Sequence, residues 1–509
     1  MPQATDKPEW MTYSTAERKA PRFDMSLTNP DLAPVDPARR TWNWWHIASL
    51  WIGMAICIPT YTLASSLVER GWSWQAAVGS VVLGNFVVLI PMVLNSHAGT
   101  KYGIPFPVLV RAPFGVLGSN VPAILRAVVA CGWFGIQTWI GGFAIYKLLE
   151  VLTPGIAHLP RFLPAWIGLG TGEAVCFLFF WAINVWIVLR GMESIKLLET
   201  WGSPFLLAIG AALLIWAFRR AGGWGPMLAN VPSANASASA GIGSIFGAGL
   251  TSAVAFWGTM ALSIPDFSRF ARSQRDQMIG QAVGLPATMA IFAFIGAAVT
   301  NATLVIFGQR ISDPIMLLAR VGGPFVVVLS MLGLSIATLT TNIAANVVAP
   351  ANDFSNIAPR RIRFKAGALI TAAVGILMMP WRLYTDAAAY IFTWLIGYGA
   401  LLGPIAGIMI VDYFVLRHRE LIVEDLYRRG GAYEYTRGVN WIAMLALAAG
   451  IAPNLPGFLG AIGAMKASPL ARSVYDWAWF VGLGVAAAVY YIGMRRSVRA
   501  GPEAAHAGR

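Results

Sequence analysis

The chain has 509 residues, of which 57% are hydrophobic and 12% are charged, and its formal net charge is +14. Soluble domains carry about 25% charged residues, so this composition excludes an ordinary soluble protein. The positive charge does not indicate nucleic-acid binding, because most Lys and Arg residues fall in the two tails and the even-numbered loops between apolar segments. This positive-inside pattern predicts a multi-pass protein of the cell inner (plasma) membrane with both termini in the cytoplasm.

Twelve segments are apolar and long enough to cross a bilayer, which takes roughly 20 helical residues. In chain order they lie near residues 44–68, 74–96, 120–152, 163–189, 197–218, 243–264, 278–307, 322–349, 366–381, 387–412, 439–458 and 473–494. The sequence therefore predicts an all-α membrane protein with twelve transmembrane helices.

Helix-breaking residues lie near the middle of two of these segments. The first contains Gly53 and Pro59, and the sixth contains Gly258 and Pro265. Proline removes a backbone donor and clashes with the preceding turn, so we expect each helix to unwind there. Unwound backbone in a bilayer is tolerated where it lines a cavity. Because the two breaks are five helices apart, they predict two inverted five-helix repeats.

These features divide the chain into consecutive regions. The 1–42 tail is polar and is expected to lack a cleavable signal sequence, and the charged and aromatic loop 413–438 is expected to form a short structured cap. The expected regions are a cytoplasmic tail (1–42), a core of two repeats (43–412, divided at about 43–218 and 243–412), a cytoplasmic loop (413–438), helices eleven and twelve (439–496) and a second cytoplasmic tail (497–509).

Polar side chains one helical turn apart mark two other segments. Trp133 and Gln137 lie in the third segment, and Asn342 and Asn346 lie in the eighth. Residues at i and i+4 share one helix face, and an amide in hydrocarbon has no water to bond. The two faces are therefore expected to point at each other or at a buried ligand. The third and eighth segments are also five apart, so they obey the same symmetry.

Motifs of catalysis are missing from the sequence. It contains no G-x-x-x-x-G-K-[ST] phosphate loop, its five histidines have no metal-ligand spacing, and no acidic pair lies deep in an apolar segment. Cys57, Cys131 and Cys176 lie in three different apolar segments, which indicates packing residues and no disulfide framework. We expect neither enzyme activity nor a bound cofactor.

A binding site without chemistry is the interpretation that remains. Trp133 can stack on the face of a planar ring while Gln137 offers an acceptor and two donors to its edge. Asn346, and less directly Asn342, can complete that edge, and Trp257 is placed to cover the other face. An unpaired buried polar group costs about 1–3 kcal/mol, so ligands without matching N–H and C=O groups would be rejected.

A second group of residues favours a cation. The hydroxyls of Thr340 and Thr341 and the main-chain carbonyls of Gly53, Ile56 and Ala337 would supply five neutral oxygens. The alternative explanation is that the adjacent hydroxyls bond back to carbonyls of the preceding turn. Hard cations prefer oxygen ligands, and a set without carboxylates favours Na⁺ over Ca²⁺ or Mg²⁺. Coupling to protons is the alternative.

Several stretches resemble the nucleobase–cation symporter-1 family. They are HAGTKYGIPFPVLVRAPFG (97–115), WFGIQTW (133–139), SIPDFSRFA (263–271), TTNIAANVVAPANDF (340–354) and GPIAGIMIVDYF (403–414). The resemblance runs from about Thr41 to Arg496, and GMESIK and DLYRRGGAYEY are most similar to the allantoin, uracil and hydantoin branch. It implies a LeuT-like fold of two inverted five-helix repeats plus two C-terminal helices, and import by alternating access with one chain as the functional unit.

The resemblance also implies roles for residues. It assigns ring stacking to Trp133 and Trp257, ligand-binding amides to Gln137 and Asn346, and sodium binding to the five oxygens named above.

The chain departs from the family pattern at two positions of the implied pocket. Cys57 stands where relatives often carry Gln or Asn, and Phe256 stands where some carry Gly. Both residues make the pocket less polar. We therefore expect allantoin or a hydantoin as substrate, followed by uracil, in preference to cytosine or purines.

Three alternative functions would each require a different ligand or different residues at the site. A cytosine or purine permease of the same family would differ only in its ligand. An amino-acid or amine carrier on the same fold needs a charged partner for a carboxylate or ammonium, which the aromatic and amide residues do not provide. A polytopic membrane enzyme needs Asp, His or Arg residues with catalytic spacing at the membrane surface.

Overall fold

The computed structural model describes residues 23–190, 192–229, 242–321, 323–385 and 389–499, and the regular elements in these ranges are helices. Eight of these helices are each long and apolar enough to cross a membrane, and one bent pair makes a ninth span. All twelve predicted segments overlap a helix or a helix pair. The observed architecture is therefore consistent with the predicted twelve spans.

The helices that correspond to the twelve segments are α1 and α2 (Trp44–Ala55, Ile58–Glu69), α3 (Trp74–Tyr102), α6 (Asn120–Leu152), α7 (Thr171–Arg190), α8 (Met192–Arg220), α10 and α11 (Ile242–Phe256, Gly258–Ser263), α13 (Gln274–Phe307), α15 and α16 (Pro324–Asn346, Val348–Ile357), α17 (Phe364–Leu377), α19 (Ile396–Ile410), α21 and α22 (Trp441–Ile451, Leu455–Ala461) and α24 (Ala478–Arg499). Shorter helices are α4 (Phe106–Leu109), α5 (Arg111–Phe114), α9 (Trp224–Met227), α12 (Pro265–Ser268), α14 (Pro314–Val321), α18 (Pro380–Leu383), α20 (Val423–Leu426) and α23 (Pro469–Asp476). Two π-helical turns, Ala389–Leu395 and Val411–Leu416, flank α19.

The predicted breaks in the first and sixth segments are confirmed. α1 and α2 meet at an angle of 55°, and Trp257 separates α10 from α11. α1 ends at Ala55, four residues before Pro59. Because proline has no N–H for the carbonyl four residues earlier, Pro59 explains why α1 stops there.

The eighth segment has a one-residue interruption at Val347 within a single long span (Phe325–Ile357), which was not predicted. α15 ends at Asn346 and α16 begins at Val348. Pro350 follows Asn346 by four residues, so the same missing donor accounts for this break. The signal was present in the sequence, since the spacing repeats that of Ala55 and Pro59.

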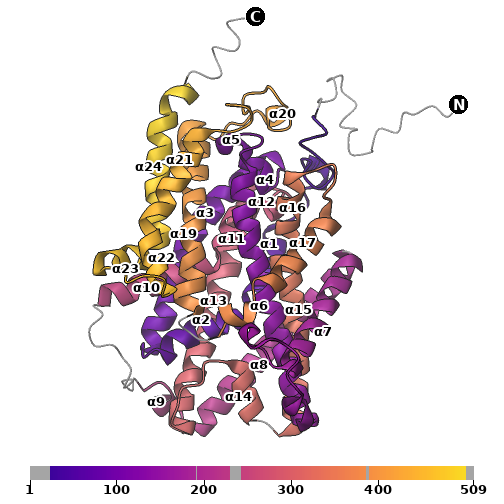
Figure 1. Cartoon of the computed structure of the whole chain (residues 1–509), viewed down its shortest axis with the longest axis vertical. Coiled ribbons are helices and arrows are strands. Elements are labelled where there is room, and N and C mark those ends of the chain that lie inside the picture. The colour runs from indigo at the N-terminus through magenta and orange to yellow at the C-terminus, as the bar shows by residue number, and fades with distance from the viewer. Residues whose placement is uncertain (1–22, 191, 230–241, 322, 386–388, 500–509) are drawn as a thin grey trace, which may run out of the picture.

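The contacts between helices define two groups, and α24 covers one side of the molecule (Figure 1). In the first group α1, α2 and α3 pack against α13, and α10 packs against α3. In the second group α6 packs against α7, α15, α16 and α17. Each group combines helices one and two, or three and four, of both predicted repeats. α21 and α24 pack on α19, outside these two groups.

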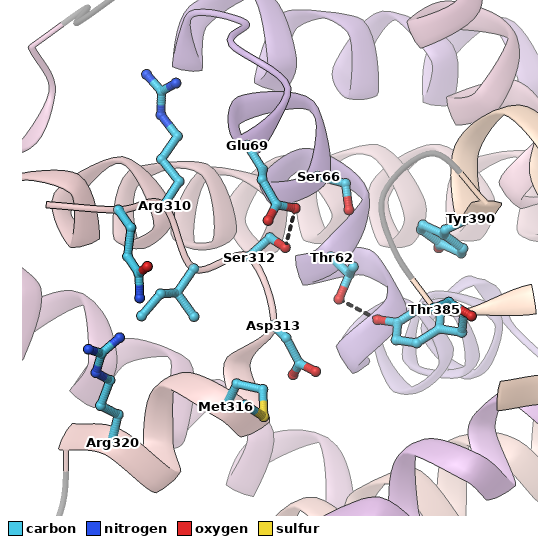
Figure 2. A pocket seen from close by; sticks show the side chains of 13 residues that line it. Thr62, Ser66, Glu69, Arg310, Ser312, Asp313, Met316, Arg320, Thr385 and Tyr390 are labelled. Carbon is cyan, nitrogen blue, oxygen red and sulfur yellow. Dashed lines mark hydrogen bonds between the residues drawn. The ribbon is translucent and has the colours of Figure 1, made fainter. Parts of the chain in front are cut away.

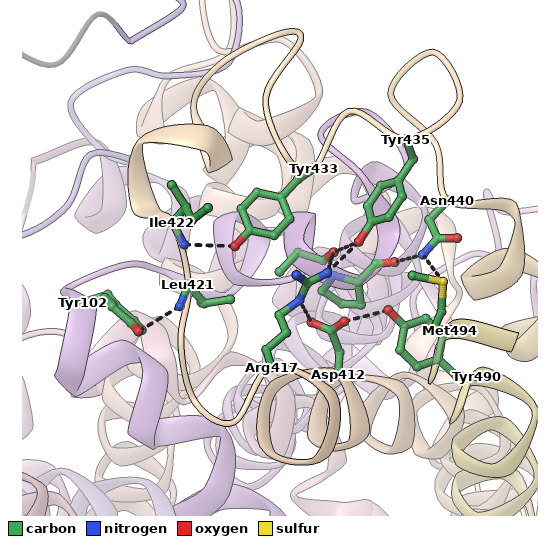
Figure 3. Close-up of polar contacts among 12 residues, drawn as sticks. Tyr102, Asp412, Arg417, Leu421, Ile422, Tyr433, Tyr435, Asn440, Tyr490 and Met494 are labelled. Atoms are coloured by element: carbon green, nitrogen blue, oxygen red, sulfur yellow. Dashed lines mark hydrogen bonds and ion pairs between the residues drawn. The ribbon is translucent and has the colours of Figure 1, made fainter. Parts of the chain in front are cut away.

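The loop at 413–438 forms the structured cap that the sequence predicts (Figure 3). Arg417 donates its Nε hydrogen to Asp412 at 2.8 Å and an Nη2 hydrogen to the Tyr435 hydroxyl at 2.7 Å. Tyr490 of α24 donates to the other Asp412 oxygen at 2.7 Å. The cap thereby ties the end of α19 to α24.

The residues that precede α1 pack at the same end of the molecule as the cap. The main-chain N–H of Asp24 donates to the Tyr427 carbonyl at 2.8 Å, and Arg111 donates to the Leu27 carbonyl at 2.7 Å. In Figure 1 the C-terminal end of α24 and α20 lie at the top, whereas α9 and α14 lie at the opposite end.

The fourth predicted segment is shorter than expected. α7 begins at Thr171 instead of near residue 163, because Pro164 precedes a short 3₁₀ turn that closes at Gly168 with φ 80°. Residues 230–241 lie outside the described residues, as do residues 500–509 of the predicted C-terminal tail (497–509).

Candidate functional site

A tight pocket with about 20 Å³ of open space lies between the two helix groups, at the helix breaks. Its walls comprise Met54, Cys57, Phe256, Trp257, Thr259 and Met260 from the first group and Trp133, Gln137, Thr341, Ala345 and Asn346 from the second. Cys57 and Trp257 lie at two of the breaks, and Asn346 directly precedes the third, at Val347. None of these described lining residues is charged, so the pocket suits a neutral ligand.

Aromatic side chains fix the ring of Trp133 in this pocket. Its indole N–H donates to the Tyr398 hydroxyl at 3.2 Å, and that hydroxyl donates to the Ala255 carbonyl at 2.7 Å. Phe256 packs edge-on against Trp133 and Trp257, with ring centroids 5.2 and 5.1 Å away. The two tryptophans therefore face the pocket with Phe256 against both of them.

Two amides complete the lining of the pocket. Gln137 is 4% exposed, and its side-chain oxygen is buried without a hydrogen-bond partner. Asn346 donates an amide hydrogen to the Asn342 oxygen at 3.0 Å. Asn342 is fully buried and does not line the pocket, so of the predicted pair only Asn346 reaches it. An unpaired buried amide oxygen makes this site ready to accept a hydrogen bond from a ligand.

The predicted cation ligands lie beside this pocket. Thr340 and Thr341 donate their hydroxyl hydrogens to the Ala337 carbonyl at 2.8 and 3.1 Å, so three of the five predicted oxygens converge. These bonds are also the back-bonding alternative considered from the sequence. Gly53 lies in the last turn of α1 and Ile56 caps it, and α1 packs against α15. Neutral oxygens at the negative end of a helix dipole fit a monovalent cation.

A larger cavity, of about 410 Å³ and lined by more polar side chains, lies beyond this pocket towards the end of the molecule where α14 lies (Figure 2). Figure 2 shows Thr62, Ser66 and Glu69 of α2 on its lining beside Ser312 and Asp313, and Ser312 donates its hydroxyl hydrogen to Glu69 at 2.7 Å. Burial raises the pKa of the Asp313 carboxyl. This cavity is called the vestibule below.

Tyrosines separate the vestibule from the pocket. Tyr384 donates its hydroxyl hydrogen to Thr62 at 2.5 Å, and Tyr390 donates to the Pro59 carbonyl at 3.2 Å. Tyr390 also lies edge-on to Trp133 at 6.3 Å. Side chains that follow α17 thus close the pocket against α2.

Charged residues that the sequence reasoning did not use seal the opposite side of the pocket. Arg126 of α6 forms an ion pair with Asp353 of α16 at 2.9 Å and donates to the Ser263 hydroxyl at 2.9 Å. Asn352 donates to Asp266 at 3.1 Å. The Arg126 and Asp353 side chains have no exposed surface, so water does not reach this ion pair in the described conformation. The position of Arg126 inside the third apolar segment was the available signal.

Known proteins that are similar to this chain are permeases, as a buried binding pocket between membrane helices would suggest. Residues 34–482 match the family described as "Permease for cytosine/purines, uracil, thiamine, allantoin". The chain is 47% identical to the purine-uracil permease NCS1 of Arabidopsis thaliana, over 93% of this chain and 79% of that protein. It is 40% identical to the allantoin permease of Bacillus subtilis, over 92% and 93% of the two chains.

A solved structure shares the fold. The nucleobase–cation-symport-1 transporter Mhp1, in a closed conformation with bromovinylhydantoin bound, matches with a TM-score of 0.76 and 28% identity, over 94% of this chain and 97% of that chain. The LeuT-like fold of inverted repeats predicted from the sequence is thereby confirmed. This multi-pass membrane protein belongs to the nucleobase–cation symporter-1 family of permeases.

Proposed function

We propose that this protein imports a small, neutral, planar ureide or imide by alternating access, coupled to Na⁺. The observation that carries the proposal is the meeting of Trp133, Trp257, Gln137 and Asn346 in one uncharged pocket at the helix breaks. Stacking on an indole recognises the ring, and the amides recognise its N–H and C=O groups. The ion pair and the tyrosines on the two sides of the pocket are the contacts that alternating access must exchange.

The preferred substrates are allantoin and hydantoins. Their five-membered rings suit a pocket narrowed by Phe256, which packs against Trp133 and Trp257, and a thiol at Cys57 adds little polarity. The allantoin permease of Bacillus subtilis and the hydantoin permease of Microbacterium maritypicum, 32% identical to this chain, support this choice. The 47% identity to a purine-uracil permease favours uracil as the second candidate.

The residues fit a coupling sodium ion. Thr340 and Thr341 would hold it through their hydroxyls, and Gly53, Ile56 and Ala337 through their carbonyls. A bound cation would supply positive charge that joins the end of α1 to α15. Because α1 also forms part of the pocket wall through Met54, ordering this helix end would favour substrate binding, and each ligand would tighten the other by one shared factor.

The orientation in the membrane is inferred from which segments lie at each end of the molecule. The cap, the residues before α1 and the end of α24 share one end of the molecule, and the positive-inside pattern supports a cytoplasmic location for that end. We infer a plasma-membrane protein with the vestibule outside. Each chain contains a complete pocket, which supports a monomeric functional unit. We assign it neither enzymatic activity nor a cofactor.

The test is uptake into liposomes that contain the purified protein, with radiolabelled allantoin and hydantoin. Unlabelled allantoin, hydantoin, uracil, cytosine and hypoxanthine are competitors, and each is tested with Na⁺ and with choline replacing it. We expect competition by the two ureides and then uracil, and loss of uptake without Na⁺.

Each outcome decides one part of the proposal. Competition by cytosine or hypoxanthine alone would replace the ureide assignment. Equal uptake in choline would refute sodium coupling, and a dependence on an inward proton gradient would then establish the proton alternative. If free amino acids are added to the panel and compete, that result would support an amino-acid carrier.

A further inference from the structure

A chain of buried hydrogen bonds runs from the second helix group to the pocket. Asn342 directs its amide nitrogen at three acceptors: the Phe134 carbonyl at 3.2 Å, the Thr138 hydroxyl at 3.0 Å and the Asn184 side-chain oxygen at 3.2 Å. Its own side-chain oxygen accepts from the Asn346 nitrogen at 3.0 Å. Three helices, α6, α7 and α15, contribute to this chain.

The donor-to-acceptor direction of these hydrogen bonds is fixed at Asn184 and Thr138, the end that lies farthest from the pocket. Asn184 donates to the Phe180 carbonyl at 2.8 Å, which turns its oxygen towards Asn342. Thr138 donates to the Phe134 carbonyl at 2.7 Å, so its hydroxyl oxygen is an acceptor for Asn342. A reversed Asn342 amide would place its oxygen against three acceptors, and a buried oxygen without a donor costs about 1–3 kcal/mol.

The fixed direction decides what Asn346 offers to a ligand. Because Asn342 presents an oxygen, Asn346 must use its nitrogen towards Asn342, and its side-chain oxygen is the end left for the pocket. Gln137 also has a buried oxygen without a partner. The pocket edge therefore offers the Asn346 oxygen and the unpaired Gln137 oxygen as hydrogen-bond acceptors.

We propose that Asn184, Thr138 and Asn342 are positioning residues that set the hydrogen-bond polarity of the pocket, so that it selects heterocycles presenting ring N–H donors to Asn346 and Gln137. This inference rests on the proposed function and narrows its substrate class. Hydantoins, allantoin and uracil carry such N–H groups beside carbonyls. The ring nitrogen of cytosine that lies between its amino and carbonyl groups is an acceptor, which would face the oxygens unfavourably.

The experiment compares ligands that differ in one N–H group. Succinimide is hydantoin with one ring N–H replaced by CH₂, and 3-methylhydantoin blocks the other. Affinities of the purified protein are measured by competition with labelled hydantoin in wild type, Thr138→Val, Asn184→Leu and the double variant. Two variants are controls. Thr138→Ser retains the hydroxyl, and Thr371→Val deletes a buried hydroxyl that bonds to the Gly367 carbonyl and takes no part in the hydrogen bonds around Asn342.

We expect wild type to prefer hydantoin over at least one analogue by roughly tenfold or more, since a site built to hydrogen-bond an N–H group rejects analogues that lack it. Thr138→Val and Asn184→Leu free Asn342 to reverse, so the preference should fall by about fivefold or more, most in the double variant. Thr138→Ser and Thr371→Val should keep the wild-type preference.

Other outcomes overturn the inference in distinguishable ways. If the variants lose affinity for hydantoin and both analogues by the same factor, the chain has only a structural role. If the preference is unchanged, the polarity is set elsewhere. If wild type transports none of these ligands, the proposed function itself fails.

Discussion

The two sides of the pocket are closed by different kinds of contact. Towards the vestibule, closure depends on hydroxyl hydrogen bonds from Tyr384 and Tyr390 to α2. Towards the cap, it depends on the buried ion pair between Arg126 and Asp353. Neutral hydrogen bonds contribute about 0.5–1.5 kcal/mol each, whereas separating a buried ion pair leaves charges without water or a partner.

This difference indicates which side opens with less cost from the described conformation. The vestibule already reaches the Tyr384–Thr62 bond, and opening from it needs only the exchange of hydroxyl partners for water. Opening towards the cap must hydrate Arg126 and Asp353 together. The conformation described here is therefore closed at the pocket and biased towards the vestibule side.

The largest expected effect comes from breaking the ion pair on the capped side. Arg126→Met leaves the Asp353 carboxylate buried and unpaired, which should destabilise the protein by about 3–5 kcal/mol. Thermal unfolding in detergent, followed by tryptophan fluorescence, should show a much lower midpoint. Arg126→Met combined with Asp353→Leu should recover most of the loss, because it removes both charges. A single variant that unfolds like wild type would contradict the role assigned to this contact.

An intermediate effect is expected in the pocket between the two closures. Gln137→Ala should weaken hydantoin or allantoin binding by about 1–3 kcal/mol, since it removes an amide that pairs with the ligand. Trp139→Ala is the matched control on the same helix, because Trp139 stacks on Phe143 at 5.3 Å and does not line the pocket. Equilibrium binding to purified protein measures both. Equal losses would point to general packing damage in α6.

The smallest effect is expected at the closure next to the vestibule. Tyr384→Phe removes the bond to Thr62 and should favour the vestibule-open state by about 0.5–1.5 kcal/mol. In a Cys131→Ala/Cys176→Ala background, membrane-impermeant thiol reagents applied from outside should label Cys57 roughly 2–10-fold faster. Tyr435→Phe, the same deletion in the cap, should not accelerate labelling. A slower reaction in Tyr384→Phe would reverse the comparison of the two sides.

Much of the fold and the centre of the site could be predicted from local sequence. Hydropathy located the helices, and Gly53 with Pro59 and Gly258 with Pro265 located two breaks. Trp133 and Gln137 lie four residues apart in one helix, so their common face followed from helical geometry alone.

Contacts between distant segments could not be predicted in this way. Arg126 and Asp353 are 227 positions apart, and no local pattern pairs them. Helical spacing also made Asn342 and Asn346 equivalent, whereas packing against Thr138 and Asn184 withdraws Asn342 from the pocket. Only the three-dimensional arrangement separates the residue that faces a ligand from the one that orients it.

The central claim, that the aromatic and amide residues at the helix breaks form the ligand site, is tested most directly by protection of Cys57. In the Cys131→Ala/Cys176→Ala background, thiol labelling of Cys57 is measured with and without the ureide that competes best in uptake. We predict that the ureide slows labelling, and that Gln137→Ala shifts this protection to higher ligand concentrations. Full inhibition of uptake with no protection of Cys57 would place the ligand elsewhere and contradict the account.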